Sequence, residues 1–189
     1  MKRVILTIGP QGSGKTTFCS RVIFQYPAIN FVCRDTILND LYGKAWMDPY
    51  TNCAAEGMKK VWEQVKNILS KRGDVVLLFD RWNESPSERI CITERLREYG
   101  SEYIEGWYFI TPEKRCLQWY EQRERSSHAL YSIKRHYRRY HACSVALEQG
   151  FDEIIEIDPL TTHPNELIGR FLRRQLAFPF GEEYYCMEV

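Results

Sequence analysis

The sequence has no hydrophobic run long enough to cross a bilayer and no leader of the secretory type. The apolar run near its start, Val4–Ile8, is too short for either purpose. The seven cysteines are scattered without a Cys-x-x-Cys pair, which argues against a zinc site and against a disulfide framework. We therefore expect a protein of the cytoplasm or another intracellular compartment, the nucleus included, with no membrane partner.

An excess of charge is also absent, because 26 Lys and Arg are balanced by 25 Asp and Glu. With a formal net charge of +1, any contact with nucleic-acid phosphates has to come from a local patch. Internal repeats and low-complexity linkers are missing as well. The 189 residues then fit a single domain over residues 1–189, with an irregular C-terminal tail over residues 176–189.

Apolar runs of strand length alternate with segments of helical periodicity. The runs are Val4–Ile8, Phe31–Cys33, Val75–Phe79, Gly106–Ile110 and Ile154–Ile157. Helical apolar faces are formed by Met58, Val61, Val65, Ile68 and Leu69, by Ile92, Leu96 and Tyr99, and by Leu167, Ile168, Phe171 and Leu172. This alternation predicts an α/β fold, in which a parallel sheet of about five strands is covered by helices on both faces. Ligands of such a sheet bind beyond the carboxyl ends of its strands.

A phosphate-binding loop follows the first predicted strand. Residues 9–16 read GPQGSGKT, a full match to G-x-x-x-x-G-K-[ST], and the residues after them can form a helix. Glycines let successive backbone N–H groups point at one phosphate, and the start of the helix adds positive partial charge. Lys15 can reach the β and γ phosphates, and the Thr16 hydroxyl can bind Mg²⁺. The predicted nucleotide contacts in the loop are Gly12, Ser13, Gly14, Lys15, Thr16 and Thr17.

A carboxylate stands at the end of the third apolar run. Asp80 directly follows Val75–Phe79, and an acid after such a strand supports Mg²⁺ directly or through water in nucleotide-binding proteins. Because Thr16 and Asp80 would lie at the same edge of the sheet, we predict both as metal-site residues. The alternative is that Asp80 caps a helix or a turn.

A second carboxylate follows Phe31–Cys33. Asp35 lies roughly twenty residues after Lys15, the length of one helix and a returning strand, which would bring it to the rim of the phosphate loop. An acid at that place can accept the proton of an attacking hydroxyl and direct it at the γ-phosphorus. Arg34 beside it would neutralise phosphate charge or pair with a surface acid. The alternative for Asp35 is an N-cap of Thr36–Tyr42.

A basic, aromatic segment lies further along the chain. Its eight basic residues are Lys114, Arg115, Arg123, Arg125, Lys134, Arg135, Arg138 and Arg139. If residues 130–143 form a helix, its apolar face is Ile133, Tyr137 and Tyr140, and its basic face is Lys134, Arg135, Arg138 and Arg139. The basic face would meet phosphates or only solvent. We predict that residues 112–143 form a lid whose Arg123 and Arg125 close on the transferring phosphoryl group.

These residues together resemble the kinase domain of polynucleotide 5′-hydroxyl kinases, of both the phage type and the animal repair type. The shared residues are Gly9–Thr17, Arg34–Thr36, Asp80 with Asn83, Arg123–His128, Tyr137 with Arg138, and Gly150–Ile154. The resemblance extends over positions 4 to 158. It implies a three-layer P-loop kinase fold with a helical lid, and transfer of the γ-phosphate of ATP or another nucleotide such as GTP to the 5′-hydroxyl end of DNA or RNA.

The resemblance also implies roles for single residues. Asp35 would be the general base, and Lys15 and Thr16 would contact phosphate and metal. Arg125 would neutralise charge on the transferring group, with Arg123 as a second nucleotide contact. The implied substrate contacts are Arg34, Asp35, Asp80 and Asn83.

The chain departs from that family at several positions. The phage type has an arginine three residues after the base, where this chain has Leu38. The family's D-x-T-N reads Asp80-Arg81-Trp82-Asn83, and Trp82 would stack on a base or fill the core. The two lid arginines are two positions apart instead of four, so either could reach the γ-phosphate. No D-x-D-x-T phosphatase motif is present, so processing of 3′ ends is not expected.

Other functions of the same architecture stay open at this point. A small-molecule or nucleoside kinase would phosphorylate free nucleosides and ignore oligonucleotides. A nucleotide switch would bind ATP or GTP without repeated transfer, but Asp35 and the lid arginines argue against it. The preference for RNA or DNA and the oligomeric state are not encoded in any motif of the sequence.

Overall fold

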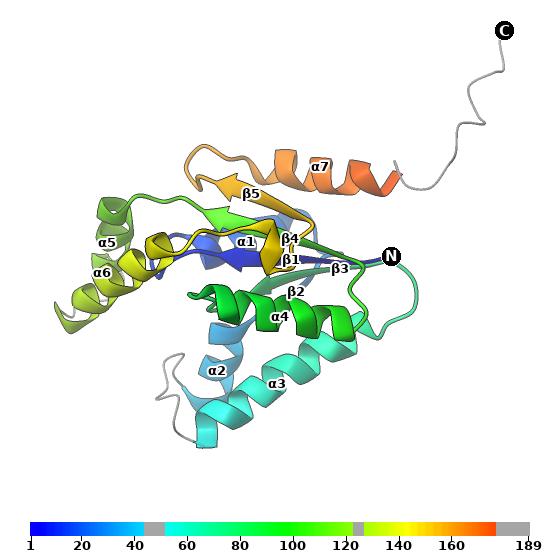
Figure 1. The fold of residues 1–189 in the computed structure, drawn as a ribbon, viewed down its shortest axis with the longest axis horizontal. Helices are drawn as coiled ribbons and strands as arrows, with labels where there is room; N and C mark the ends of the chain where they lie inside the picture. The colour runs from blue at the N-terminus through cyan, green and yellow to red at the C-terminus, as the bar shows by residue number, and fades with distance from the viewer. Residues whose placement is uncertain (44–51, 123–126, 177–189) are drawn as a thin grey trace, which may run out of the picture.

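A computed structural model describes residues 1–43, 52–122 and 127–176 of the chain (Figure 1). The strands are β1 (Lys2–Ile8), β2 (Asn30–Cys33), β3 (Val75–Asp80), β4 (Tyr103–Phe109) and β5 (Glu153–Ile157). The α-helices are α1 (Lys15–Gln25), α2 (Arg34–Tyr42), α3 (Asn52–Leu69), α4 (Pro86–Glu98), α5 (Glu113–Glu121), α6 (Ser127–Ala142) and α7 (Pro164–Leu176), and a short 3₁₀ helix, η1, spans Leu147–Gln149. Most of the predicted tail lies outside the described residues.

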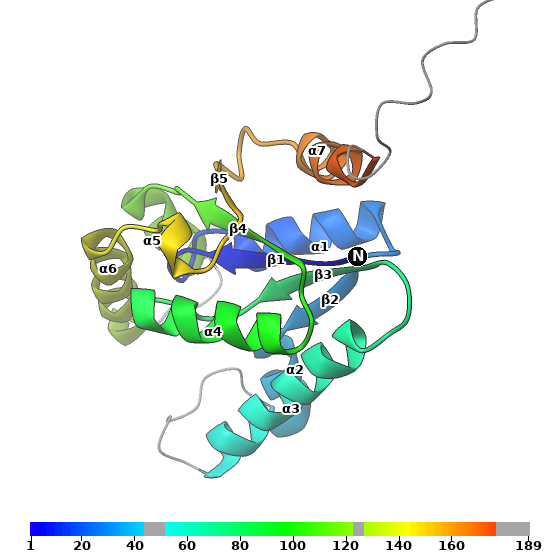
Figure 2. The ribbon, with the colours of Figure 1, turned by 45° about the vertical axis from the view of Figure 1, so that its right-hand side comes forward.

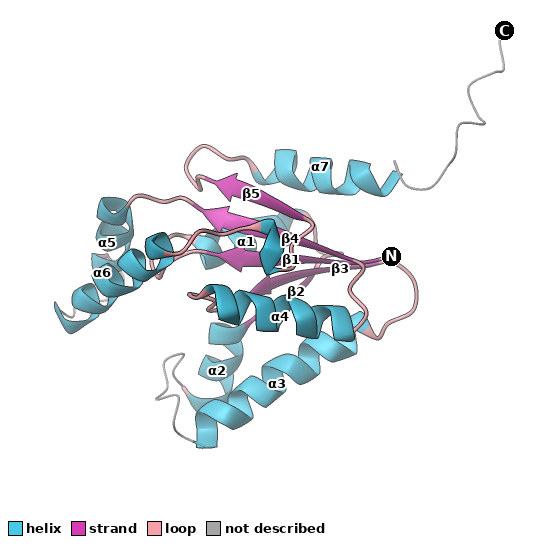
Figure 3. Ribbon diagram, viewed as in Figure 1, coloured by secondary structure: helices cyan, strands magenta, loops and turns pink. Residues whose placement is uncertain are grey.

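The strands form one parallel sheet in the order β2-β3-β1-β4-β5 (Figure 3). The predicted α/β architecture is therefore confirmed. The largest difference in a strand boundary is in β4, which begins at Tyr103 and not at the predicted Gly106. The early part of β4 contains Glu105, which is buried and accepts a hydrogen bond of 2.7 Å from the Trp107 indole. An acid inside the strand breaks the apolar pattern, and the indole of Trp107, two residues along the same strand, satisfies it there.

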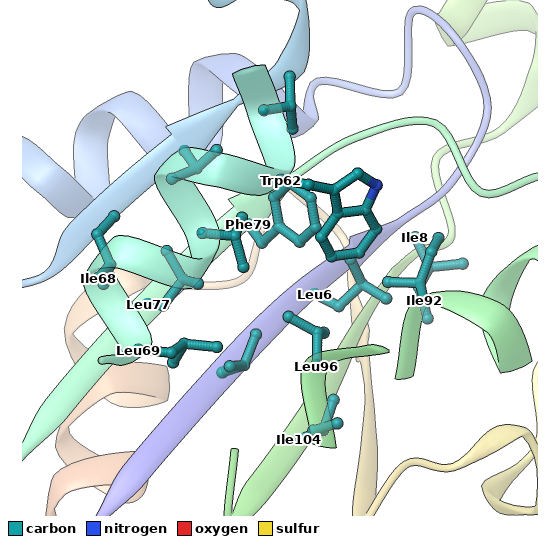
Figure 4. Close-up of a cluster of buried hydrophobic side chains, with 14 of the residues drawn as sticks. Leu6, Ile8, Trp62, Ile68, Leu69, Leu77, Phe79, Ile92, Leu96 and Ile104 are labelled. Carbon is teal, nitrogen blue, oxygen red and sulfur yellow. The ribbon is translucent and has the colours of Figure 1, made fainter. Parts of the chain in front are cut away.

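Side chains of alternate strand positions form two separate cores. Leu6 and Phe79 face α3 and α4, where Figure 4 shows them packed around Trp62. Ile5 and Trp107 face α1 and α7 on the other side of the sheet. Figure 2 shows α1 and α7 on one side of the strands and α3 and α4 on the other. This is the layering that the period of two along each strand and the helical faces predicted.

The position of β1 decides where ligands can bind. It is paired with β3 on one side and β4 on the other, and its side chains from Arg3 to Ile8 are buried. The loop that follows Ile8 therefore emerges from the middle of the sheet. Helices α1 and α2 both begin at the same edge, next to the ends of β1 and β2. Within the described part of the chain, every helix is too short or too polar to span a membrane.

The turn at Gly150 gives a test of how the end of η1 packs on α4. Gly150 has φ of 93°, and a Cβ placed on it would lie 2.8 Å from Cβ of Thr93. Gly150→Ala combines left-handed strain with overpacking, so we expect urea unfolding to show a loss of about 2–4 kcal/mol. Gly73 also has a positive φ, of 82°, but open space around its Cβ position. The control Gly73→Ala should lose only about 1 kcal/mol, and equal losses would contradict the packing.

Candidate active site

The phosphate loop folds between β1 and α1 as its glycines require. Gly14 is the residue before α1 and has φ of 88°, and Gly12 has φ of 80°. A Cβ on Gly12 would lie 2.7 Å from the backbone oxygen of Cys116, so α5 packs directly against the loop. The Thr111 hydroxyl donates a hydrogen bond of 2.8 Å to the carbonyl of Ser13 and holds the loop from the end of β4. Both glycine positions therefore need the backbone freedom and the small size of glycine.

Lys15 lies folded back onto the loop. Its ammonium donates hydrogen bonds to the carbonyls of Gly9 at 2.7 Å and Pro10 at 2.8 Å. Burial lowers the pKa of Lys15, and the nearby charges of Asp80 and Asp35 partly oppose that shift. A phosphate entering the loop offers this cation a charged acceptor, which is a stronger partner than a neutral carbonyl.

Asp80 is the buried acid of the site. Its two carboxylate oxygens accept hydrogen bonds of 2.7 Å each, one from the Thr7 hydroxyl and one from the Thr16 hydroxyl. The Cys33 thiol lies 3.8 Å from the same carboxylate, and burial, together with the Asp80 charge, raises the pKa of that thiol. Asp80 is the last residue of β3, so it caps neither a helix nor a turn, and that alternative is wrong.

Thr7 is the site residue that sequence reasoning missed. It is the last residue but one of β1 and is fully buried, and its hydroxyl donates a hydrogen bond to Asp80. The available signal was a single hydroxyl inside the otherwise apolar run Val4–Ile8. A buried hydroxyl needs a partner, but the sequence does not say which strand supplies it.

The residues present fit a magnesium ion that is held mainly by nucleotide phosphates. Within residues 1–43, 52–122 and 127–176, no three His, Cys, Asp or Glu side chains gather as a metal cage. Mg²⁺ usually takes few protein ligands beside waters and substrate phosphates. The exposed Thr16, fixed by the buried carboxylate of Asp80, supplies a ligand of that kind. The two residues that the sequence predicted for the metal thus lie in direct contact.

Asp35 lies at the start of α2, whose N-cap is Cys33, so the N-cap alternative for Asp35 is wrong. Its side chain is 63% exposed and pairs with Arg34 at 2.7 Å. Its charge acts to raise the pKa of Lys15 against the effect of burial, so the carboxylate lies near the phosphate loop. An acid in the first turn also suits the positive end of α2. The arrangement leaves an accessible carboxylate beside a phosphate-binding loop.

Two residues that follow Asp80, Asn83 and Trp82, have different neighbours. Asn83 is fully buried, and its amide donates to the carbonyl of Thr7 at 2.6 Å. A contact of Asn83 with substrate therefore stays a prediction, beside a clear role in joining the strand ends. Trp82 is half-buried and packs edge-on against His136, with ring centres 4.5 Å apart, and against Tyr140 at 5.7 Å.

Leu38 occupies the position where the phage-type kinases have an arginine. It is fully buried, and Gly57 of α3 leaves the room for it. Leu38 therefore holds α2 against α3 and offers no contact to a phosphate.

The predicted lid is described only in part. Arg123 and Arg125 lie outside the described residues. In α6 the expected faces are present, since Ile133 and Tyr140 are buried and the basic side chains are exposed. Arg139 forms an ion pair of 3.1 Å with Glu84, which fixes the end of α6 near the end of β3.

Thr7 allows the buried end of the site to be tested. Thr7→Val leaves an Asp80 oxygen without a donor, so we expect a loss of about 1–3 kcal/mol in unfolding free energy. Because Asp80 then holds Thr16 less firmly, calorimetric binding of ADP should need more Mg²⁺. The control Thr93→Val removes another buried hydroxyl, which bonds the carbonyl of Gln149 at 2.7 Å. It should lose similar stability at unchanged Mg²⁺ dependence, and the same unchanged dependence in Thr7→Val would disprove the positioning role.

Three solved structures illustrate the likeness of the chain to known proteins. A chain of the Pnkp1/Rnl/Hen1 RNA repair complex has a TM-score of 0.64 and 22% identity, over 75% of this chain and 44% of that one. A fungal RNA kinase has a TM-score of 0.57 and 16% identity, over 94% and 86%. Shikimate kinase from Acinetobacter baumannii, in complex with shikimate, has a TM-score of 0.51 and 15% identity, over 93% of each chain. The present chain thus spans less than half of the RNA repair protein that it matches.

None of the curated proteins compared with the chain matches it. At these identities the likeness to solved structures establishes the fold, a three-layer α/β fold shared with P-loop kinases. Residues 4–143 match the family described as the AAA domain, which covers the phosphate loop, both acids and α6. The match spans most of the 189 residues, and the chain therefore belongs to the AAA domain family.

Proposed function

We propose that the protein is a polynucleotide 5′-hydroxyl kinase, which transfers the γ-phosphate of ATP or another nucleoside triphosphate to the 5′ end of DNA or RNA. The fold and the phosphate loop support a phosphotransferase. The observation that carries the proposal is the exposed Asp35 carboxylate, which lies close enough to Lys15 for its charge to act on the pKa of that residue. It offers a base to an alcohol that approaches from solvent.

The proposed reaction is an in-line displacement at the γ-phosphorus. The 5′-hydroxyl oxygen forms a bond to phosphorus, and the bond from phosphorus to the β–γ bridging oxygen breaks. The electron pair of the broken bond leaves with the nucleoside diphosphate. Asp35 accepts the hydroxyl proton as the new bond forms. Arg34, paired with Asp35 at 2.7 Å, keeps the carboxylate in place and adds positive charge near the acceptor.

On the nucleotide side of the site, different residues bind the phosphates, orient the Thr16 hydroxyl and neutralise charge. The N–H groups of residues 12–17 cradle the phosphates, and Lys15 exchanges its loop carbonyls for phosphate oxygens. Asp80 orients the Thr16 hydroxyl. Bound Mg²⁺ would neutralise charge on the phosphates. Arg123 and Arg125 of the proposed lid, residues 112–143, would add cations at the transferring group, with Arg125 as the one that we assign to the γ-phosphate.

The choice of a nucleic acid as acceptor is supported by surface charge near the site. Helix α6 exposes Lys134, Arg135 and Arg138, although the whole chain is nearly neutral. A local basic face of this kind suits a phosphate backbone. The likeness to a fungal RNA kinase and to a chain of an RNA repair complex points in the same direction.

A small-molecule kinase is the competing assignment, which the likeness to shikimate kinase favours. The two differ in the acceptor. We expect label from [γ-³²P]ATP, or from GTP, to enter 5′-hydroxyl oligonucleotides of DNA or RNA in preference to free nucleosides. Transfer to nucleosides without any transfer to oligonucleotides would reverse the assignment.

The base can be tested by one substitution and a matched control. Asp35→Asn removes the proton acceptor but keeps the size of the side chain, so kcat should fall about 10²–10⁴-fold. ADP binding should persist, because the phosphate loop is intact. Asp40→Asn changes another exposed acid of the same helix and should keep full activity. Undiminished turnover in Asp35→Asn would remove Asp35 from the chemistry.

A further inference from the structure

A second charged hollow opens between α3 and α4, beyond the end of β3. Its volume is about 300 Å³, and its wall includes Trp62, Arg81, Ser87, Glu88 and Arg95. None of these side chains belongs to the phosphate loop or to the acids described above. The hollow lies on the face of the sheet that carries α3 and α4, the side of the core drawn in Figure 4.

Two arginines share one aromatic ring in this hollow. The guanidinium carbon of Arg81 lies 5.4 Å from the ring centre of Trp62, and that of Arg95 lies 4.8 Å from it. The hydrogen bond seen for the Arg81 guanidinium goes from Nε to the Trp82 carbonyl at 3.0 Å. Among the described residues, neither arginine forms an ion pair within 4.0 Å. Two neighbouring cations without a paired acid are a receptor for an anion.

The pKa of Arg81 also supports an anion site in this hollow. The pKa of Arg81 is lowered to about 10, mainly by burial and also by the positive charges of Arg34 and Arg95. Glu88 opposes that shift, but its carboxylate already accepts a hydrogen bond of 3.0 Å from the Ser85 N–H in the capping box of α4. An anion bound in the hollow would offset what burial costs the guanidinium.

The sheet register connects this hollow to the proposed acceptor site. Cys33 of β2 lies opposite Asp80 of β3, so Arg34 at the start of α2 and Arg81 leave the sheet at the same edge, and the charge of Arg34 acts on the pKa of Arg81. Arg34 pairs with Asp35, while Arg81 leads to Arg95 on α4. A row of three guanidinium groups therefore runs from the carboxylate of Asp35 into the hollow.

We propose that the hollow between α3 and α4 binds a backbone phosphate of the acceptor strand, with Arg81 and Arg95 as the ligands. The proposal rests on the proposed function, because it assigns the path of the strand away from Asp35. A guanidinium group matches a phosphate with two parallel hydrogen bonds, and two such groups lie at this wall. Trp62 is nearly buried beneath them, so the hollow recognises charge and not a stacked base.

This path differs from one along α6. The exposed cations of α6, Lys134, Arg135 and Arg138, lie on a separate helix that packs near α5. A strand that leaves Asp35 along α6 would not meet Arg95 of α4. The two paths therefore give opposite results when cations of α4 or of α6 are removed.

The direct test measures how a fluorescein-labelled 5′-hydroxyl oligonucleotide, of DNA and of RNA, binds at increasing salt. Loss of one phosphate contact lowers the slope of log K against log salt by about 0.7 for a single strand. We expect that reduction in Arg95→Gln and in Arg81→Gln. Arg21→Gln removes an exposed arginine from α1 on the opposite face and should leave the slope unchanged. An unchanged slope in Arg95→Gln, which is exposed and should fold normally, would overturn the proposal, and loss of slope in Arg138→Gln alone would place the strand on α6.

Kinetics separate this proposal from the proposed function. In Arg95→Gln we expect the KM for an oligonucleotide to rise about 3–10-fold, with the KM for ATP and kcat unchanged. A 5′-hydroxyl nucleoside without phosphates should not respond to the substitution. If the unaltered protein transfers no phosphate to any oligonucleotide, the proposed function fails, while the salt dependence of binding still reports on the hollow. If transfer occurs and Arg95→Gln leaves both KM and slope unchanged, only the path is wrong.

Discussion

The carboxylate of Asp80 joins the end of β3 to β1 and to the first turn of α1 through two hydroxyl groups. Thr7 and Thr16 each donate to it at 2.7 Å, and it is almost fully buried. A buried charge is tolerated when its hydrogen-bonding capacity is used, and here the two hydroxyl partners come from two other elements, β1 and α1. The same contacts that stabilise the acid also fix the hydroxyl of Thr16 in the phosphate loop. Stability and the geometry of the site thus depend on the same group.

The central position of β1 in the sheet explains why the Asp80 carboxylate lies beside the phosphate loop. Because β1 is covered on both sides by β3 and β4, the loop that leaves it has neighbours in all directions. The neighbours impose glycine where side chains would collide, as at Gly12 against the backbone of Cys116. They also place the start of α2, and with it Asp35, at the rim of the loop. A binding site for an anion, with an exposed acid at its rim, therefore follows from the strand order β2-β3-β1.

The acceptor side of the site is organised by arginines whose neighbours are not obvious in the sequence. Arg34 and Arg81 are far apart in the chain, but the pairing of β2 with β3 brings them to the same edge of the sheet. Arg95 comes from α4 and, like Arg81, lies against the ring of Trp62. Leu38 of α2 is buried against α3. Positive charge therefore lies along the face of α3 and α4 as well as on the exposed face of α6.

Local chemistry in the sequence determined the phosphate loop, the five strands and the helical faces. A glycine-rich loop between a strand and a helix needs no distant partner to be recognised, because its backbone geometry is set by residues 9–16. The acids at the ends of two strands could be predicted for the same reason, since parallel strands end at one edge. The strands and the helical faces follow short-range patterns, with periods of two and about 3.6 residues.

Tertiary structure alone decided which distant groups meet. The buried Thr7 of β1 donates to Asp80 of β3, although a hydroxyl breaks the apolar pattern of its strand and the two residues are far apart in the sequence. The placement of both Arg81 and Arg95 against the ring of Trp62 depends on how α3 and α4 pack on the sheet. A sequence pattern states that a polar side chain is inside, but only strand register and helix packing decide which partner satisfies it.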